Sequence, residues 1–164
     1  MINLLCMFIL IFTVFTSGHV FAQDKVVVVP LGKTSLPTVA AFNSTNGQVS
    51  LTLTEATICQ IVAKLTSTGI IIANASGYID LHDVTNSKVI CSITKDSTSH
   101  DDTAAIIGGG NTISAVKLIP FGATRGFNVT EAGETTIRLV CKGSVGTSDV
   151  NDANLTVMFF PNEL

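Results

Sequence analysis

The alternation of apolar and polar side chains is the feature that most constrains the fold of this chain. In Thr135–Lys142, Ile137, Leu139 and Cys141 fall on one side of an extended strand, with polar side chains mostly on the other. The alternating segments are rich in Thr, Val and Ile, whose branched Cβ atoms suit a pleated sheet better than a helix. The predicted strands are Lys25–Leu31, Gln48–Leu53, Thr57–Leu65, Gly69–Ala75, Tyr78–His82, Lys88–Thr94, Thr112–Ile119, Gly126–Thr130, Thr135–Lys142 and Asn154–Phe160.

Short polar segments separate these strands and predict turns. They include NSTNG at 43–47, NASG at 74–77, IIGGGN at 106–111 and GSVGTSDVNDAN at 143–154. The one helix candidate, around Glu55–Lys64, lacks a polar face at helical spacing, so no crossover helix is available to build a parallel sheet. The sequence therefore predicts an all-β protein: a single-domain antiparallel β-sandwich of jelly-roll type after a signal peptide.

The first 22 residues have the pattern of a signal peptide. They carry no charged side chain, and the apolar run Leu4–Phe15 suits a signal h-region but is short for a bilayer span. Val20 and Ala22 suit signal peptidase, which predicts a domain over 23–164 in a secreted, periplasmic or cell-surface location. A retained membrane anchor is the alternative; after cleavage we expect no membrane insertion.

Charge and motif content exclude several classes of function. The chain has 9 basic and 12 acidic residues, a net charge of −3 and no basic cluster, so nucleic acids and anionic membranes are not expected partners. No G-x-S-x-G motif is present, and outside the leader only His82 and His100 remain as histidines. We therefore expect no enzyme activity, with a hydrolase of unknown type as an alternative.

Three cysteines, Cys59, Cys91 and Cys141, remain after Cys6 leaves with the leader. Alternation places all three with the more apolar set of side chains, toward the core. An exported protein favours a disulfide, and we prefer Cys91–Cys141, which closes a loop of about 50 residues. Cys59–Cys141 is the alternative pair, and the remaining cysteine is expected to be a buried apolar side chain.

Two segments are candidates for metal binding, SHDDT at 99–103 and DVNDAN at 149–154. In the second, Asp149, Asn151, Asp152 and Asn154 supply four oxygen-bearing side chains of the kind that Ca²⁺ prefers. The glycine and the final glutamate of an EF-hand loop are missing. Asp and Asn also stabilise turns through their own backbone, so a turn without metal is the alternative. No cofactor other than Ca²⁺ is expected.

The segment GFNVTEAGETTIRLVCKG, followed by NLTVMFFP, resembles the last three strands of the C1q/TNF-like jelly roll. Ala132-Gly133-Glu134 stands at the turn, and Gly69 begins a strand like the Gly-led strand of that family. Trimers of the family form through an aromatic-rich face, whereas Ile70–Ile72 occupy the place of its usual aromatic residue here. The segment DKVVVVPLGK is similar to the start of exported proteins of Gram-negative bacteria, which implies a bacterial origin.

These features predict an exported, non-enzymatic β-sandwich with a binding or structural role at the cell exterior. Its ligand or surface partner is unknown, and loops 95–111 and 143–153 are the expected recognition sites, because a rigid sandwich carries variable polar loops. The alternative role is a subunit of an oligomeric surface assembly. Val26–Val29 lack alternation, which predicts either a strand covered on both faces or an edge strand docked on a neighbouring subunit. The second possibility would make the chain a homo-oligomer.

Overall fold

The computed structural model describes residues 25–28, 39–81, 87–102, 106–110, 117–143 and 148–162. The predicted signal peptide and His82 lie outside these residues. Within them, no helix could cross a membrane. The strands are β1 (Lys25–Val28), β2 (Val39–Ser44), β3 (Gln48–Leu51), β4 (Ala56–Leu65), β5 (Gly69–Leu81), β6 (Ser87–Lys95), β7 (Ile106–Gly110), β8 (Lys117–Val129), β9 (Gly133–Gly143) and β10 (Ser148–Pro161).

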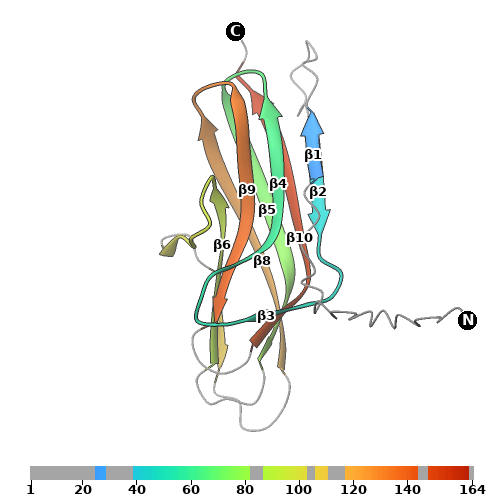
Figure 1. The fold of residues 1–164 in the computed structure, drawn as a ribbon, viewed down its shortest axis with the longest axis vertical. Helices are drawn as coiled ribbons and strands as arrows, with labels where there is room; N and C mark the ends of the chain where they lie inside the picture. The colour runs from blue at the N-terminus through green and yellow to red at the C-terminus, as the bar shows by residue number, and fades with distance from the viewer. Residues whose placement is uncertain are drawn as a thin grey trace, which may run out of the picture.

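The strands form two sheets that lie one in front of the other (Figure 1). Sheet A has the order β1-β4-β9-β6-β7, and sheet B has the order β2-β10-β5-β8. β3 pairs with the first residues of β10, on the same side of β10 as β2. Among the described strands, all pairings are antiparallel except that of β1, which runs parallel to β4. The connections from β4 to β5, β5 to β6, β8 to β9 and β9 to β10 all cross between sheets. The chain is therefore an all-β sandwich with jelly-roll strand order, as predicted.

Side chains that alternate along the strands fill the space between the two sheets. Ile137, Leu139 and Cys141 of β9 are fully buried, so the predicted inward face of this strand is confirmed. The inward side chains of sheet B that meet them include Ile71, Ile79 and Leu155, all with no exposed surface. Burial of these apolar side chains is the main favourable contribution to the stability of the sandwich, because each fully buried Leu or Ile contributes about 1.5–3 kcal/mol.

The predicted turn at 74–77 is wrong, because β5 runs without interruption from Gly69 to Leu81. Gly77 faces the core of the sandwich. A Cβ atom at this position would lie 2.9 Å from the Phe121 ring and 3.1 Å from Ala153 Cα. The glycine therefore permits close packing between β5 and its neighbours, and it was mistaken for a turn residue.

Three other strands, β7, β8 and β2, also differ from the prediction. Within the predicted turn at 106–111, Ile106–Gly110 forms an edge strand, β7, whose backbone pairs with Ser87–Cys91. Residues 126–130 do not begin a new strand, because β8 extends back to Lys117. β2 was not predicted, since VAAFNS contains two Ala and one Asn, which have low strand propensity. Its pairing with β10 supplies what propensity does not.

The final strand begins at Ser148 rather than Asn154, so the predicted turn at 143–154 is mostly wrong. The Asp- and Asn-rich segment pairs with β5 and contains a bulge between Asn151 and Asn154. Asp152 sits in the bulge with a φ of 48°, a backbone conformation that Asp and Asn tolerate better than most residues. Polar residues fit a strand here because alternate positions lie outside the core.

Candidate functional site

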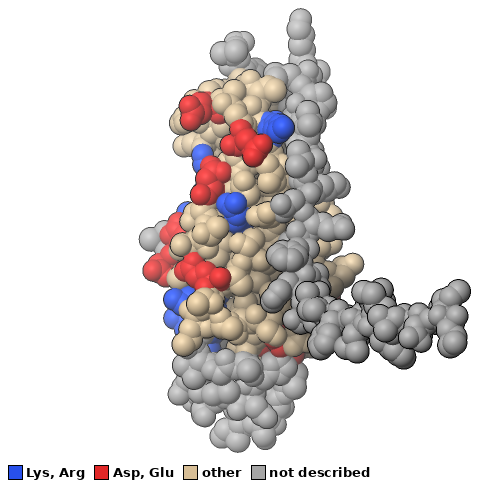
Figure 2. Space-filling view, viewed as in Figure 1, with Lys and Arg blue, Asp and Glu red and all other residues tan. Residues whose placement is uncertain are grey.

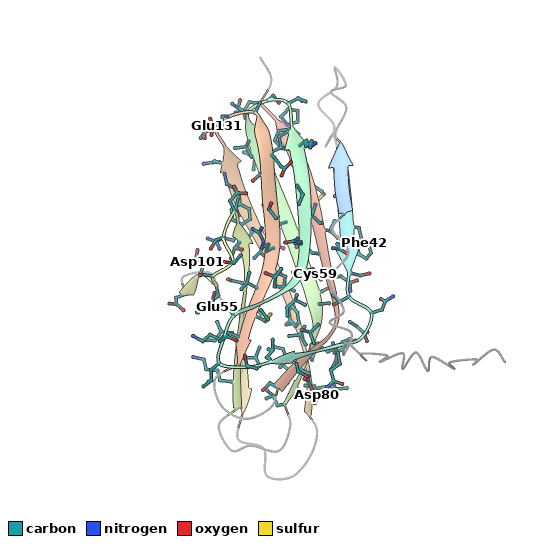
Figure 3. All side chains as sticks on the ribbon, in the orientation of Figure 1. Phe42, Glu55, Cys59, Asp80, Asp101 and Glu131 are labelled. Carbon is teal, nitrogen blue, oxygen red and sulfur yellow. A yellow bond between two sulfur atoms is a disulfide. The ribbon has the colours of Figure 1, made fainter. Side chains whose placement is uncertain are left out.

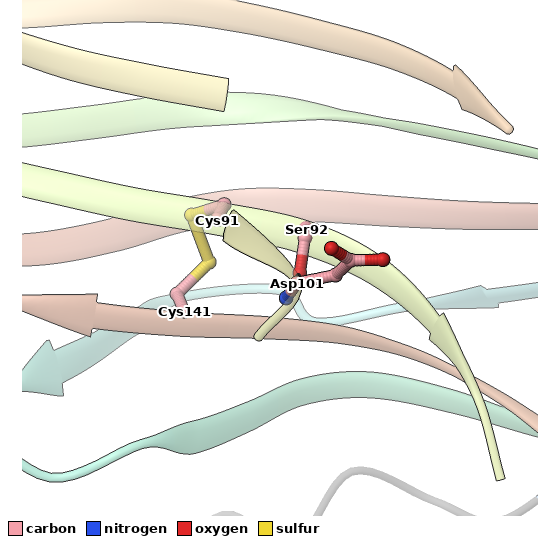
Figure 4. The surroundings of a disulfide bond; sticks show 4 residues. All are labelled: Cys91, Ser92, Asp101 and Cys141. Atoms are coloured by element: carbon pink, nitrogen blue, oxygen red, sulfur yellow. Dashed lines mark hydrogen bonds between the residues drawn. A yellow bond between two sulfur atoms is a disulfide. The ribbon is translucent and has the colours of Figure 1, made fainter. Parts of the chain in front are cut away.

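The described part of loop 95–111 folds back as a hook, residues 96–102, beside the end of β6. Asp96 makes the turn with a φ of 54°. Its carboxylate accepts hydrogen bonds from the Thr135 hydroxyl (2.9 Å) and the Thr136 backbone N–H (2.7 Å) on β9. At the far end of the hook, the Asp101 N–H donates to Ser92 Oγ over 2.8 Å (Figure 4). The hook is therefore held to sheet A at both ends.

His100 joins the hook to the connection between β3 and β4. Its Nδ1 lies 2.5 Å from Glu55 Oε1, its Nε2 lies 2.7 Å from Asp102 Oδ1, and its backbone N–H donates to Glu55 Oε2 over 3.1 Å. The hydrogen bond with Glu55 is the main reason that the pKa of His100 is raised. Partial burial opposes ionisation of Glu55, but its hydrogen bonds with His100 outweigh burial and lower its pKa. The imidazolium form thus bridges two carboxylates.

Arg125 extends from sheet B and contacts the other side of the hook. It lies on an inward position of the edge strand β8, and its guanidinium donates to the Ile93 carbonyl oxygen of β6 over 2.8 Å. The same guanidinium forms an ion pair with Asp101 and lies 5.0 Å from the centre of the Phe127 ring. Figure 3 shows Asp101 and Glu55 on the same side of the molecule, where the edges of the two sheets meet.

These elements surround a groove of about 580 Å³, which we call the edge groove. Hydroxyl groups of Thr94, Ser97 and Ser99 lie along it, and the Phe127 ring adds an apolar surface. Its other lining residues are Lys95, His100, Asp101, Asp102 and Arg125. Most of the charges in this groove are paired with one another. The Thr94 and Ser97 hydroxyls donate to the Ser97 and Ser99 carbonyl oxygens, so they offer a ligand mainly acceptor oxygens.

The geometry of His100 disfavours catalysis. A general base needs a ring nitrogen in hydrogen-bonding reach of the group that it deprotonates. Both nitrogens of His100 face carboxylates instead, although Ser97 and Ser99 are nearby. Among the described residues, no group of three or more His, Cys, Asp or Glu side chains is arranged to hold a metal ion. His100 as placed is therefore not free to act as a general base toward either serine.

The structure joins Cys91 and Cys141, the pair that was preferred from the sequence, as a disulfide between β6 and β9 (Figure 4). The two residues are direct register partners, with Cα atoms 4.1 Å apart. Cys59 is free and buried, and its thiol donates to the Ala153 carbonyl oxygen over 3.5 Å. Burial raises the pKa of this thiol, so it is a poor nucleophile.

The four calcium candidates lie along β10 and its bulge rather than in a loop. Asp149 is buried and accepts a hydrogen bond from the Gln48 side chain, whereas Asp152 is exposed. The Asn154 side-chain amide donates to the Asp152 carbonyl oxygen over 3.2 Å. Asn151 is half-buried on the same strand. Calcium binding by this set stays a prediction.

Sequence reasoning identified part of the edge groove and missed the rest. The segment SHDDT was singled out for metal chemistry, and its His100, Asp101 and Asp102 do cluster. Glu55 and Arg125 were missed, because they lie 45 and 24 residues from their partners His100 and Asp101. An arginine at an inward position of an alternating strand was the one available signal.

Comparison with known proteins adds no assignment. No protein-family model matches the chain, and no curated protein matches it.

Proposed function

We propose that the chain is an exported, non-enzymatic protein that binds a polar partner at the cell exterior through the edge groove. The groove itself is the observation that carries this proposal: hydroxyl groups and one aromatic ring lie beside charges that are mostly paired internally. Because the hook is tied to both sheets, the groove needs little ordering when a partner binds, which favours affinity. The expected partner presents neutral hydrogen-bonding groups.

The disulfide supports the proposed location. Disulfides persist in oxidising compartments and are rare in the cytosol, so the pair Cys91–Cys141 agrees with export by the predicted signal peptide. The resemblance to the C1q/TNF-like jelly roll remains part of the proposal. Its support is that β5 begins at Gly69, β9 follows the turn at Ala132-Gly133, and β10 ends at Pro161, as in the segments from which the resemblance was drawn.

A binding screen of the exported chain against glycans and cell-surface proteins tests the proposal. Lys95→Glu reverses a charge at the edge groove, and Lys64→Glu makes the same change on an exposed position of β4 outside it. We expect Lys95→Glu to weaken capture of the partner and Lys64→Glu to leave it unchanged. Equal effects of the two substitutions, or turnover of an ester, peptide or glycoside substrate, would contradict the proposal.

The second candidate function is a subunit of an oligomeric surface assembly. The structure docks β1 on β4 of the same chain, in parallel, so this strand does not by itself favour an assembly. A different surface does: the outer face of sheet B combines exposed apolar side chains with an almost complete lack of charge.

A further inference from the structure

The outer face of sheet B consists of rows of side chains that point away from the core. The cross-strand register places Phe160 beside Ile70, Met158 beside Ile72, and Thr156 beside both Asn74 and Phe42. Phe42 is 49% exposed and Ile70 is 44% exposed, which is unusual for large apolar side chains. We call this surface, formed by the outward side chains of β2, β10, β5 and β8, the B face.

The B face carries almost no charge. In the five paired rows from Phe160–Ile70 to Asn151–Tyr78, the outward side chains are apolar, hydroxyl, amide or glycine. The exposed carboxylate along this part of β10 is that of Asp152, in the bulge between Asn151 and Asn154. The last row contains Asp149 and Asp80, but these carboxylates are only 3% and 9% exposed. The outer face of sheet A is different: Figure 2 shows side chains of both signs interspersed over it.

We propose that the B face is a homodimer interface, in which the B faces of two copies stack against each other. A surface with so little charge is complementary to its own copy, because a symmetric contact buries few unpaired charges. This inference rests on the second candidate function and is independent of the edge groove. The stacking would repeat the packing inside the sandwich, where two sheets meet through alternate apolar side chains.

The area of the B face matches what a stable dimer needs. β5 has 13 residues, so the face is about 43 Å long at a rise of roughly 3.3 Å per residue. Four strands about 4.8 Å apart give a width of about 19 Å, because β2 and β3 together line one side of β10. The product is about 800 Å², which equals the area per partner of a standard specific interface.

Pairing through the β8 edge of sheet B is less favourable than stacking. β8 is a long edge strand, and such strands pair with other chains unless something opposes it. Pro120 lacks an N–H group, and Arg125 directs a charge inward along the same strand toward β6. Both are common ways in which edge strands avoid pairing, so association through β8 is disfavoured relative to stacking of the B faces.

Sedimentation velocity of the exported chain, purified from a bacterial host over a range of concentrations, tests the proposal. We expect a dimer that Ile70→Lys dissociates, with an affinity lowered by about a hundredfold or more, because the symmetric interface buries the substituted charge twice. Leu53→Lys is the matched control, since Leu53 is 67% exposed in the connection between β3 and β4, outside the B face. Phe42→Lys serves as a second variant if Ile70→Lys does not fold, as judged by thermal melting.

Three results would overturn the inference. The first is a monomeric wild-type chain at every concentration. The second is a dimer that Leu53→Lys weakens as much as Ile70→Lys or Phe42→Lys does. The third is flotation of the monomeric chain with phosphatidylcholine vesicles, lost on Ile70→Lys, which would assign the B face to a lipid surface. A binding screen that fails while the dimer persists would refute the edge-groove proposal alone.

Discussion

Removing the Cys91–Cys141 disulfide should destabilise the fold substantially, and the size of the effect can be worked out from the structure. The bond closes a loop with a sequence separation of 50 residues. In the chain-entropy model, a loop of this length lowers the entropy of the unfolded chain by about 14 cal/mol/K, which is about 4 kcal/mol at 25 °C. For a domain of this size, that corresponds to a fall in melting temperature of roughly 8–16 °C.

Urea denaturation with and without reductant measures the difference. We expect the free energy of unfolding of the wild-type chain to fall by about 4 kcal/mol on reduction. The Cys91→Ala/Cys141→Ala double variant should show no effect of reductant. Cys59→Ala is the control: it removes a buried thiol that forms no disulfide, so its sensitivity to reductant should match that of the wild type.

Two outcomes would refute this reasoning. A loss below about 1 kcal/mol on reduction would mean that the loop does not contribute as the chain-entropy model requires. Abolition of the reductant effect by Cys59→Ala would point to the alternative pair, Cys59–Cys141. Alkylation of the denatured, unreduced chain followed by intact mass gives an independent check, because one free thiol is expected after removal of the leader.

The remaining predictions concern pH, packing and metal. Because the pKa of His100 is raised in the folded state, its imidazolium stabilises the fold fully below about pH 6.5. This contribution is lost as the pH rises through the higher folded-state pKa. The melting temperature of His100→Gln should therefore fall less at neutral and alkaline pH than that of the wild type. An unchanged pH profile in that variant would rule out the hook as its source. Gly69→Ala should cost about 1–3 kcal/mol, because the new Cβ collides with the Phe160 carbonyl oxygen. Gly126→Ala should be close to neutral, since its Cβ would lie 3.9 Å from the nearest atom, the Ile71 carbonyl oxygen; urea denaturation compares the two, and equal costs would contradict the packing argument. Calcium at about a hundredfold its dissociation constant should stabilise the fold by about 2.7 kcal/mol, and Asp152→Asn should reduce the effect. Coincident melting curves in EDTA and in calcium would show that the calcium prediction is wrong.

The sequence determined the fold class and the inward faces of the strands. Alternation with a period of two is a local property, because successive side chains of any extended strand point in opposite directions. Ile137, Leu139 and Cys141 could therefore be assigned to the core without knowing which strand they meet, and Cys91 could be assigned to the same interior.

Tertiary structure alone decided the sites. Whether Gly77 marks a turn or a close approach depends on Phe121 and Ala153, which lie on other strands. Glu55 reaches His100 only because the connection between β3 and β4 passes beside the hook. The B face emerges only once the register sets the outward side chains of β10 beside those of β2 and β5. Contacts between residues far apart in sequence depend on the pairing of whole strands, and a local pattern carries no information about that pairing.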